Sequence, residues 1–123
     1  MILVDTSVWI DHFCKGDELL ADLLGREQVV MHPFVIGELA MGHLPRRLAI
    51  LADLRDLPQV TVAQHIEVMH FIERGRLFGT GVGYLDAHLL AGVSLTSGAA
   101  LWTRDKQLLA VAERLSLAAH LAH

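Results

Sequence analysis

The chain has 123 residues, which fits one domain over residues 1–123 around one hydrophobic core. Its formal charge of −4 argues only weakly against a nucleic-acid partner, because bound metal ions would offset part of the acidity. No segment approaches the roughly 20 apolar residues of a membrane span, and the first residues lack the pattern of a signal peptide, so we expect a cytoplasmic protein.

Composition also predicts a surface that a partner covers. Apolar residues make up 53% of the chain and its mean hydropathy is +0.43, both high for a soluble monomer. Cys14 is the single cysteine, so it cannot form a disulfide within the chain. We expect Cys14 to have a packing role.

Strands and helices alternate along the chain, as judged from apolar spacing and helix-capping residues. In chain order, we expect strands over 2–4, 29–32, 60–62 and 100–103, and helices over 8–14, 18–24, 33–42, 45–55, 63–74, 84–95 and 106–115. Apolar strands that alternate with helices are typical of parallel sheets buried between helices. The expected fold is therefore α/β, a three-layer domain around a mostly parallel central sheet.

Local signals set the boundaries of these elements. Asp5, Thr6 and Ser7 are consecutive candidate N-caps for the first helix, and Asp17 is a candidate for the second. Pro33 suits the first turn of the third helix. These signals place Asp5 at a strand-to-helix junction.

Apolar spacing also predicts which residues of two helices face the core. The expected inward-facing residues are Leu48, Leu51 and Ala52 in the helix over 45–55, and Ile66, Met69 and Ile72 in the helix over 63–74. Four glycines between residues 75 and 83 predict a flexible connection to the next helix.

Four acidic residues stand out because each is embedded in apolar sequence. They are Asp5, Glu38, Asp86 and Asp105. Asp5 and Asp105 each follow a strand, which places them at the carboxyl edge of a parallel sheet, where ligands usually bind. Glu38 shares a helix face with Val35 and Met41, and we expect it to point inward. Asp86 lies above the apolar stripe of its helix and should also point inward, near the helix N-terminus.

The four carboxylates can therefore converge at one edge of the sheet. Carboxylates that approach one another in a low-dielectric site raise one another's pKa values unless they share a cation. Oxygen ligands without His or Cys suit Mg²⁺ or Mn²⁺. The sequence thus predicts a divalent-metal site.

Each acidic residue also has a purely structural interpretation. Asp5 and Asp105 can be helix N-caps, whereas Glu38 and Asp86 can be paired with an arginine such as Arg74 or Arg104. Histidines add no clear ligand set. We expect His32 and His88 to lie in the core or at its rim, and the pairs His65/His70 and His120/His123, which match no zinc pattern, to lie on the surface.

Four motifs in this order resemble the PIN domain, and most closely the VapC-type toxins of bacterial type II toxin–antitoxin systems. They are VDTSVWID over 4–11, the lone Glu38 in an apolar helix, GYLDAHLLA over 83–91 and LWTRD over 101–105. The resemblance covers the whole chain. It implies an α/β/α fold and a Mg²⁺- or Mn²⁺-dependent endoribonuclease that is usually dimeric and is inhibited by a VapB-type antitoxin.

By position, the resemblance also assigns roles to individual residues. It implies that Asp5, Glu38, Asp86 and Asp105 are catalytic and bind metal, and that Thr6, Ser7 and Thr103 are supporting hydroxyl residues. Basic residues that can meet an RNA backbone, or simply cover solvated faces, are Lys15, Arg46, Arg47, Arg74, Arg76 and Arg104. Transfer, ribosomal and messenger RNA all remain open as substrates, since no base-reading residue can be named.

Two other functions fit parts of the pattern. A receiver-type signalling module has a similar length and an acidic pocket, but it needs adjacent acids after the first strand, where Asp5 is followed by Thr6 and Ser7. A PIN-like binding module without catalysis would have no need of all four acids.

Overall fold

The computed structural model describes residues 1–121, and its centre is a small parallel sheet. The strands β1 (Ile2–Val4), β2 (Val29–Val30) and β3 (Ala100–Trp102) lie in the order β2-β1-β3, and both pairs are parallel. In register, Ile2 is opposite Val29 on one side and Ala100 on the other. The central strand therefore has partners on both edges, and the predicted parallel sheet is confirmed.

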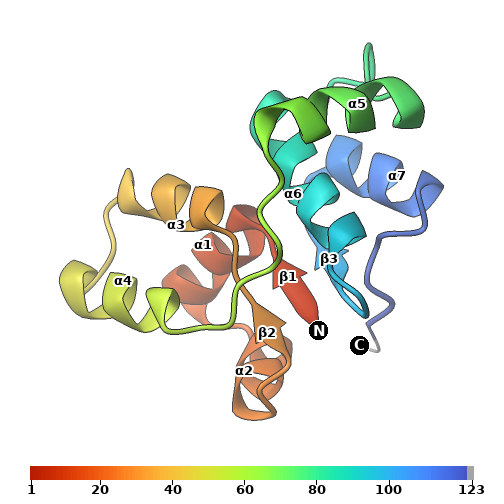
Figure 1. Cartoon of the computed structure of the whole chain (residues 1–123). Helices are drawn as coiled ribbons and strands as arrows, with labels where there is room; N and C mark the ends of the chain where they lie inside the picture. The colour runs from red at the N-terminus through yellow and green to blue at the C-terminus, as the bar shows by residue number, and fades with distance from the viewer. Residues whose placement is uncertain (122–123) are drawn as a thin grey trace.

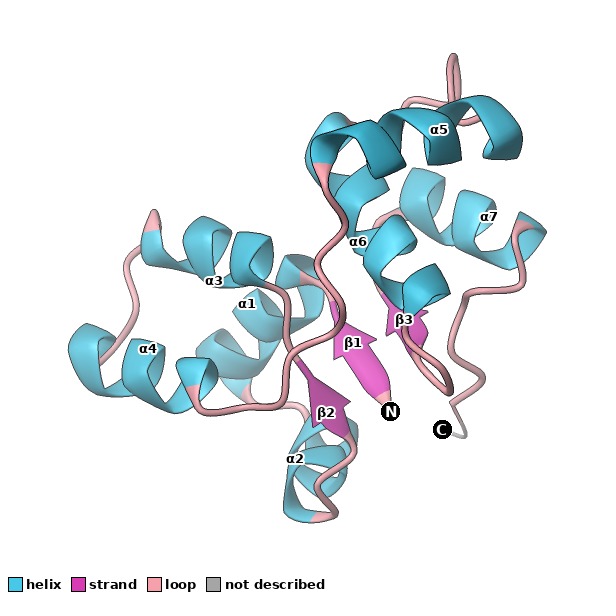
Figure 2. Cartoon of the chain, viewed as in Figure 1, coloured by secondary structure: helices cyan, strands magenta, loops and turns pink. Residues whose placement is uncertain are grey.

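Helices flank the sheet on two sides. They are α1 (Thr6–Lys15), α2 (Glu18–Gly25), α3 (Pro33–Ala40), α4 (Arg47–Arg55), α5 (His65–Gly75), α6 (Tyr84–Leu95) and α7 (Lys106–Arg114). Helices α1, α3 and α4 lie to one side of the strands, and α5, α6 and α7 lie to the other (Figure 1). Figure 2 shows the three strands enclosed between these helices, which is the three-layer α/β/α arrangement predicted. No helix among residues 1–121 is long and apolar enough to cross a membrane.

Side-chain caps fix where several helices begin. Asp17 accepts a hydrogen bond from the Leu20 amide at 2.9 Å and caps α2, as predicted. Pro33 occupies the first turn of α3, also as predicted, and the helix is preceded by His32, whose Nδ1 accepts from the Phe34 amide at 3.0 Å.

The predicted strand over 60–62 does not form. Gln59 makes one isolated parallel bridge with Met31, and the Thr61 amide then donates to the Thr96 hydroxyl at 2.9 Å rather than to the sheet. Val62 is 46% exposed. The segment is therefore diverted from the sheet edge toward the C-terminal end of α6.

Helix α6 is the centre of the core. Its residues from Ala87 to Val93 are all buried, and they include His88. His32 is fully buried as well, so both histidines are core residues, as expected. The exposed positions of His65, His70 and His120 likewise agree with the prediction, and His123 lies outside the described residues.

The inward-facing residues predicted for α4 and α5 are partly wrong. Leu48 and Ala52 are exposed, whereas Leu51 and Leu54 are buried. In α5, Ile66 is 63% and Met69 is 43% exposed, Ile72 is half-buried, and Val68 is the buried residue of that helix. Both helices lie at the periphery of the fold. The rest of the protein therefore covers a narrower face of each helix than the spacing of apolar residues predicts. Cys14, in the last turn of α1, is also exposed, so the predicted packing role is wrong.

Candidate active site

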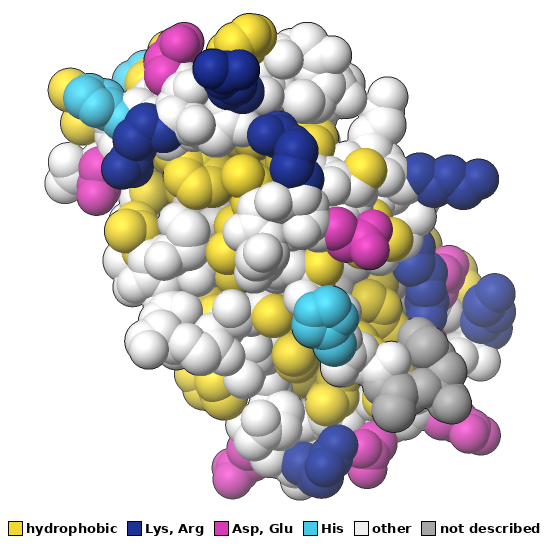
Figure 3. All heavy atoms as spheres, turned by 90° about the vertical axis from the view of Figure 1, so that its right-hand side faces the viewer, with side chains coloured by type: hydrophobic (Ala, Val, Ile, Leu, Met, Phe, Trp, Pro, Cys, Tyr) yellow, Lys and Arg dark blue, Asp and Glu magenta, His cyan; other side chains and the backbone are white. Residues whose placement is uncertain are grey.

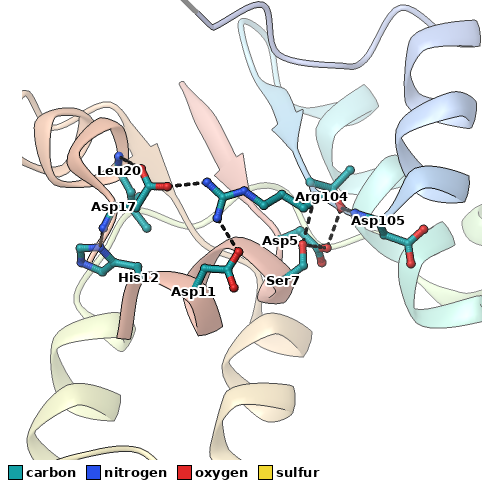
Figure 4. Close-up of polar contacts among 9 residues, drawn as sticks. Asp5, Ser7, Asp11, His12, Asp17, Leu20, Arg104 and Asp105 are labelled. Carbon is teal, nitrogen blue, oxygen red and sulfur yellow. Dashed lines mark hydrogen bonds and ion pairs between the residues drawn. The ribbon is translucent and has the colours of Figure 1, made fainter. Parts of the chain in front are cut away.

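Asp5 follows β1 directly, and its carboxylate is nearly inaccessible. Asp5 is 6% exposed, and its side chain makes no capping hydrogen bond to a backbone amide of α1 although it occupies the N-cap position. Instead, Asp5 Oδ2 accepts from the Ser7 hydroxyl at 2.9 Å and from the Thr103 hydroxyl at 2.7 Å (Figure 4). The alternative that Asp5 is only a helix cap is therefore wrong.

The three predicted supporting hydroxyl residues all contact an acidic residue or its backbone. Thr103 is buried, and its oxygen also accepts the Asp105 amide at 3.1 Å. Thr6 Oγ1 donates to Glu38 Oε1 at 2.9 Å. Consecutive hydroxyls after β1 thus hold two different acids, Thr6 the glutamate and Ser7 the aspartate at position 5.

Glu38 does not point into the core as predicted. It is exposed, as is Met41 at 89%, whereas Val35 is fully buried. The buried face of α3 is centred between Val35 and Leu39, and at 100° per residue Glu38 lies about 80° from that centre. Glu38 therefore sits at the margin of the helix–core contact, where Thr6 reaches it.

Asp86 lies in the first turn of α6 and is half-buried. Burial, and after it the negative charges of Asp5, Glu38 and Asp105, raise its pKa from 3.8 to about 6. The three charges come from the end of β1, from α3 and from the start of α7. All four acids named from the sequence are thus within electrostatic reach of one another.

Asp105 combines two features. Its Oδ1 accepts from the Leu108 amide at 2.9 Å and so caps α7, which is the structural interpretation that the sequence allowed. The residue is nevertheless exposed, and its charge still acts on Asp86. A carboxylate has two oxygens, so capping a helix with one leaves the other for a ligand.

The donor set fits a hard divalent cation in its chemistry. The oxygens are carboxylates, and a cation would offset the charges of Asp5, Glu38 and Asp105, which after burial contribute to the raised pKa of Asp86. Within residues 1–121, however, no three His, Cys, Asp or Glu side chains stand close enough to hold one ion as they are placed. An ion held by three of these carboxylates at once would therefore require them to move toward one another.

Arg104 does not pair with Glu38 or Asp86, which was one of the roles that the sequence allowed for it. It pairs with Asp11 through Nη1 at 2.7 Å and with Asp17 through Nη2, and its guanidinium lies 5.5 Å from the centre of the Trp102 ring. These acids raise the pKa of Arg104, and hydrogen bonds from Leu20 and Arg104 lower that of Asp17.

Glu38 and Asp86 consequently have no arginine partner among the described residues, and the ion-pair alternative for them is wrong. Sequence reasoning missed Asp11 and Asp17 as partners of Arg104. They lie 93 and 87 residues away along the chain, so no spacing pattern connects them.

A second polar group near Asp86 was also missed. The Tyr84 hydroxyl lies 2.9 Å from His88 Nε2 and also contacts His65 Nδ1. The rings of Tyr84 and His88 meet edge to face, with 4.7 Å between their centres. The spacing of Tyr84 and His88, one helical turn apart, was the available signal. The contacts fix the start of α6 against α5.

Parallel strands between helices, with acids gathered beyond the ends of β1 and β3, define the class of protein. The PIN domain profile matches residues 2–114, and the chain belongs to the PIN-domain family. It is 50% identical over 108 residues to Ribonuclease VapC32 of Mycobacterium tuberculosis, in strains CDC 1551 / Oshkosh and ATCC 25618 / H37Rv. The match covers 88% of this chain and 87% of each relative. The predicted resemblance is confirmed, and the receiver-type alternative is wrong.

Proposed function

We propose that this chain is a metal-dependent endoribonuclease and the toxin of a VapBC-type toxin–antitoxin system. The observation that carries the proposal is the gathering of Asp5, Glu38, Asp86 and Asp105 beyond the ends of β1 and β3. Half of the aligned residues are identical to a protein named as a VapC ribonuclease, which supports the same activity. Residues 1–123 would act as one nuclease domain in the cytoplasm, where RNA is available.

The acids would hold Mg²⁺, with Mn²⁺ as a substitute. A divalent cation bound there supplies two effects, a lowered pKa of water and neutralisation of charge on the phosphoryl oxygens. Asp5 is oriented for this role by two hydroxyl donors on Oδ2. Asp86 must lose its proton to act as a ligand, and its pKa of about 6 allows this at neutral pH.

Cleavage assays test the proposal directly. The purified protein should cut RNA in the presence of Mg²⁺ or Mn²⁺ and stop when EDTA is added. Asp86→Asn should abolish both cleavage and toxicity to cells while the protein stays folded. Asp53→Asn is the matched control, because Asp53 is an exposed acid on α4 outside the cluster, and it should keep full activity. Undiminished cleavage in EDTA would identify a different mechanism, and absent cleavage would favour a PIN-like binding module.

We also propose two protein partners, a VapB-type antitoxin and a second copy of the chain. Apolar side chains remain exposed on two sides of the fold. Met41 and Leu48 are 89% and 79% exposed on the α3–α4 side, and a groove of about 440 Å³ lies between α5 and α6. Hydrophobic side chains also lie exposed between Lys and Arg side chains on the face turned to the right of Figure 1 (Figure 3). Apolar surface of this kind supports association with other chains.

Co-expression tests the antitoxin. The product of the neighbouring gene should relieve growth arrest and co-purify with the chain as a stable complex. The inactive Asp86→Asn variant should still form this complex, which separates binding from loss of toxicity. Elution of the two proteins as separate species would contradict the antitoxin proposal without affecting the nuclease proposal.

A further inference from the structure

We propose that Arg104 is a positioning residue, which acts through Ser7 to orient the Asp5 carboxylate. The inference rests on the proposed function, in which Asp5 is one of the metal-binding acids. Arg104 lies between β3 and α7, and its side chain extends away from Asp105 toward α1 and α2 (Figure 4). It therefore connects the site to a part of the chain that contributes no acid to the cluster.

Three contacts hold the Arg104 guanidinium. Nη1 donates to Asp11 Oδ2 at 2.7 Å, Nη2 donates to Asp17 Oδ2, and the group lies over the Trp102 ring. Asp17 is itself fixed, because its Oδ1 caps α2 through the Leu20 amide at 2.9 Å. A planar guanidinium with several donors suits two carboxylates at once, which a single ammonium group does not.

The backbone amide of Arg104 orients the hydroxyl of Ser7. Its amide donates to Ser7 Oγ at 3.1 Å, and the Ser7 hydroxyl lies 2.9 Å from Asp5 Oδ2. A serine hydroxyl has a single proton, and the amide occupies one of its lone pairs, so the proton is directed to the carboxylate. The next amide, that of Asp105, orients the Thr103 hydroxyl toward Asp5 Oδ2 in the same way.

Two successive amides of the β3–α7 connection thus orient two hydroxyl donors toward one oxygen. Both donors meet Asp5 at Oδ2, and Asp5 Oδ1 has no hydrogen-bond partner among residues 1–121. Oδ1 is therefore the oxygen left for a cation. If Arg104 loses its anchors, the connection is freer to move, and Ser7 loses the amide that orients it.

The exposure of the Arg104 ion pairs helps to distinguish a positioning role for Arg104 from a contribution to folding stability alone. The side chains of Arg104 and Asp11 are 37% and 40% exposed, and an ion pair this exposed contributes little to folding, whereas Asp17 is 15% exposed. The chain offers a comparison in the pair Arg26–Asp22 on α2, whose atoms are 3.0 Å apart and whose side chains are 64% and 56% exposed. Within residues 1–121, the side chains of that pair make no hydrogen bond to a residue of the site.

Arg104→Gln is the first test, with Arg26→Gln as the matched control. Arg104→Gln should lower kcat about tenfold, keep KM within about threefold, and weaken Mn²⁺ binding about tenfold, at the lower end of effects known for residues that orient metal ligands. Mn²⁺ affinity is measured from the metal-induced rise in Tm, independently of cleavage. Arg104→Lys should restore only part of both losses, since one ammonium cannot bind both acids as the guanidinium does. Arg26→Gln should change neither quantity.

A double-mutant cycle tests the route through Ser7. In a Ser7→Ala background, Arg104→Gln should cause no further loss of kcat or Mn²⁺ affinity, because the hydroxyl through which it acts is already gone. Fully additive losses would overturn the inference. So would a large rise in KM with unchanged Mn²⁺ affinity, which would make Arg104 a contact to RNA instead.

Two further outcomes are distinguishable. If Arg104→Gln fails to fold, Asp11→Asn removes one anchor while leaving the Asp17 cap of α2 in place, and a loss of Mn²⁺ affinity is again expected. If the parent binds Mn²⁺ but cleaves no RNA, the proposed function is wrong. The role of Arg104 is then tested by Mn²⁺ affinity alone, measured across the double-mutant cycle with Ser7→Ala. A parent that neither binds Mn²⁺ nor cleaves RNA would overturn both.

Discussion

At the scale of single residues, Asp86 is the acid whose ionisation the fold opposes. Burial and the charges of three other acids raise its pKa from 3.8 to about 6. Folding therefore favours the protonated form. The metal-free protein loses stability as pH rises from 3.8 toward about 6, and the loss is complete above that range.

Asp86→Asn should reverse this loss in the metal-free protein. Asparagine cannot ionise, so the variant is expected to unfold at a higher urea concentration than the parent at pH 7.5 in EDTA. Its advantage should shrink as pH is lowered to about 4.5, because the parent's Asp86 is then protonated in the folded state. Urea unfolding across this pH range gives the measurement, and Asp53→Asn should show no such trend. A variant less stable than the parent at pH 7.5 would contradict the raised pKa.

The Thr103 hydroxyl should matter to stability because it is a buried donor to a carboxylate. Thr103→Val keeps the shape of the side chain but removes the 2.7 Å hydrogen bond to Asp5. A bond to a charged group is worth about 1.5–3 kcal/mol, so the free energy of unfolding should fall by about 2 kcal/mol. Thr103→Ser keeps the hydroxyl and should lose less. Equal stability of the Val variant and the parent would mean that water replaces the bond.

Sequence predicted the acids better than their surroundings. Asp5, Asp86 and Asp105 could be found because each follows or interrupts an apolar run at a helix start. The orientation of Glu38 could not, because residues three apart share a helix face only approximately and the true face depends on what α3 packs against. The partners of Arg104 required the tertiary fold itself.

At the scale of elements, the close approach of α6 to the segment before α5 depends on Gly92. A Cβ atom at this position would lie 2.9 Å from the Thr61 carbonyl oxygen and 3.3 Å from a methyl group of Val60. Backbone is the nearest neighbour, so the contact cannot be relieved by a side-chain rotation. Because residue 92 is a glycine, the segment over 60–62 can pack against α6 and does not join the sheet as the predicted strand.

Gly92→Ala is therefore expected to destabilise the protein. Overpacking of a well-packed interior typically costs about 1–3 kcal/mol, which exceeds the gain in helix propensity of about 1 kcal/mol for replacing glycine in a helix. Gly37→Ala in α3 is the control, because a Cβ atom there meets nothing within 4 Å and should leave stability equal or higher. Thermal unfolding of both variants makes the comparison. A Gly92→Ala protein with an unchanged Tm would show that the segment yields easily.

The types of the elements were predictable where local signals agreed. Which residues of a peripheral helix face the core was not predictable. The strands β1 and β3 are apolar runs followed by an acid or a hydroxyl, and α2 and α3 begin at a capping aspartate and a proline. Helix α5 has more apolar residues than one face can bury, so its spacing allowed two orientations. The fold buries Val68 and leaves Ile66 and Met69 exposed.

At the scale of the whole molecule, metal binding should couple to folding. A cation that binds only the folded state stabilises it by about 2.7 kcal/mol at a hundredfold excess over Kd, which corresponds to about 10 °C in Tm for a domain of this size. The gain should be present at pH 7.5 and should fall below about pH 6, where Asp86 holds its proton. Melting curves with and without Mn²⁺ at the two pH values test this. A Tm that Mn²⁺ leaves unchanged at pH 7.5 would show that the carboxylates share no cation.

The central position of β1 has a consequence for how the protein is made. β1 precedes β3 by almost the whole length of the chain, yet the Asp5 amide donates to the Trp102 carbonyl at 2.9 Å and the Asp5 carboxylate depends on Thr103. During translation, Asp5 is therefore synthesised long before β3 and Thr103, to which it is hydrogen-bonded in the folded protein. The four acids can assemble only after synthesis has passed Asp105, so under the proposed function a fragment that ends before Asp105 lacks one acid of the site and is expected not to cleave RNA.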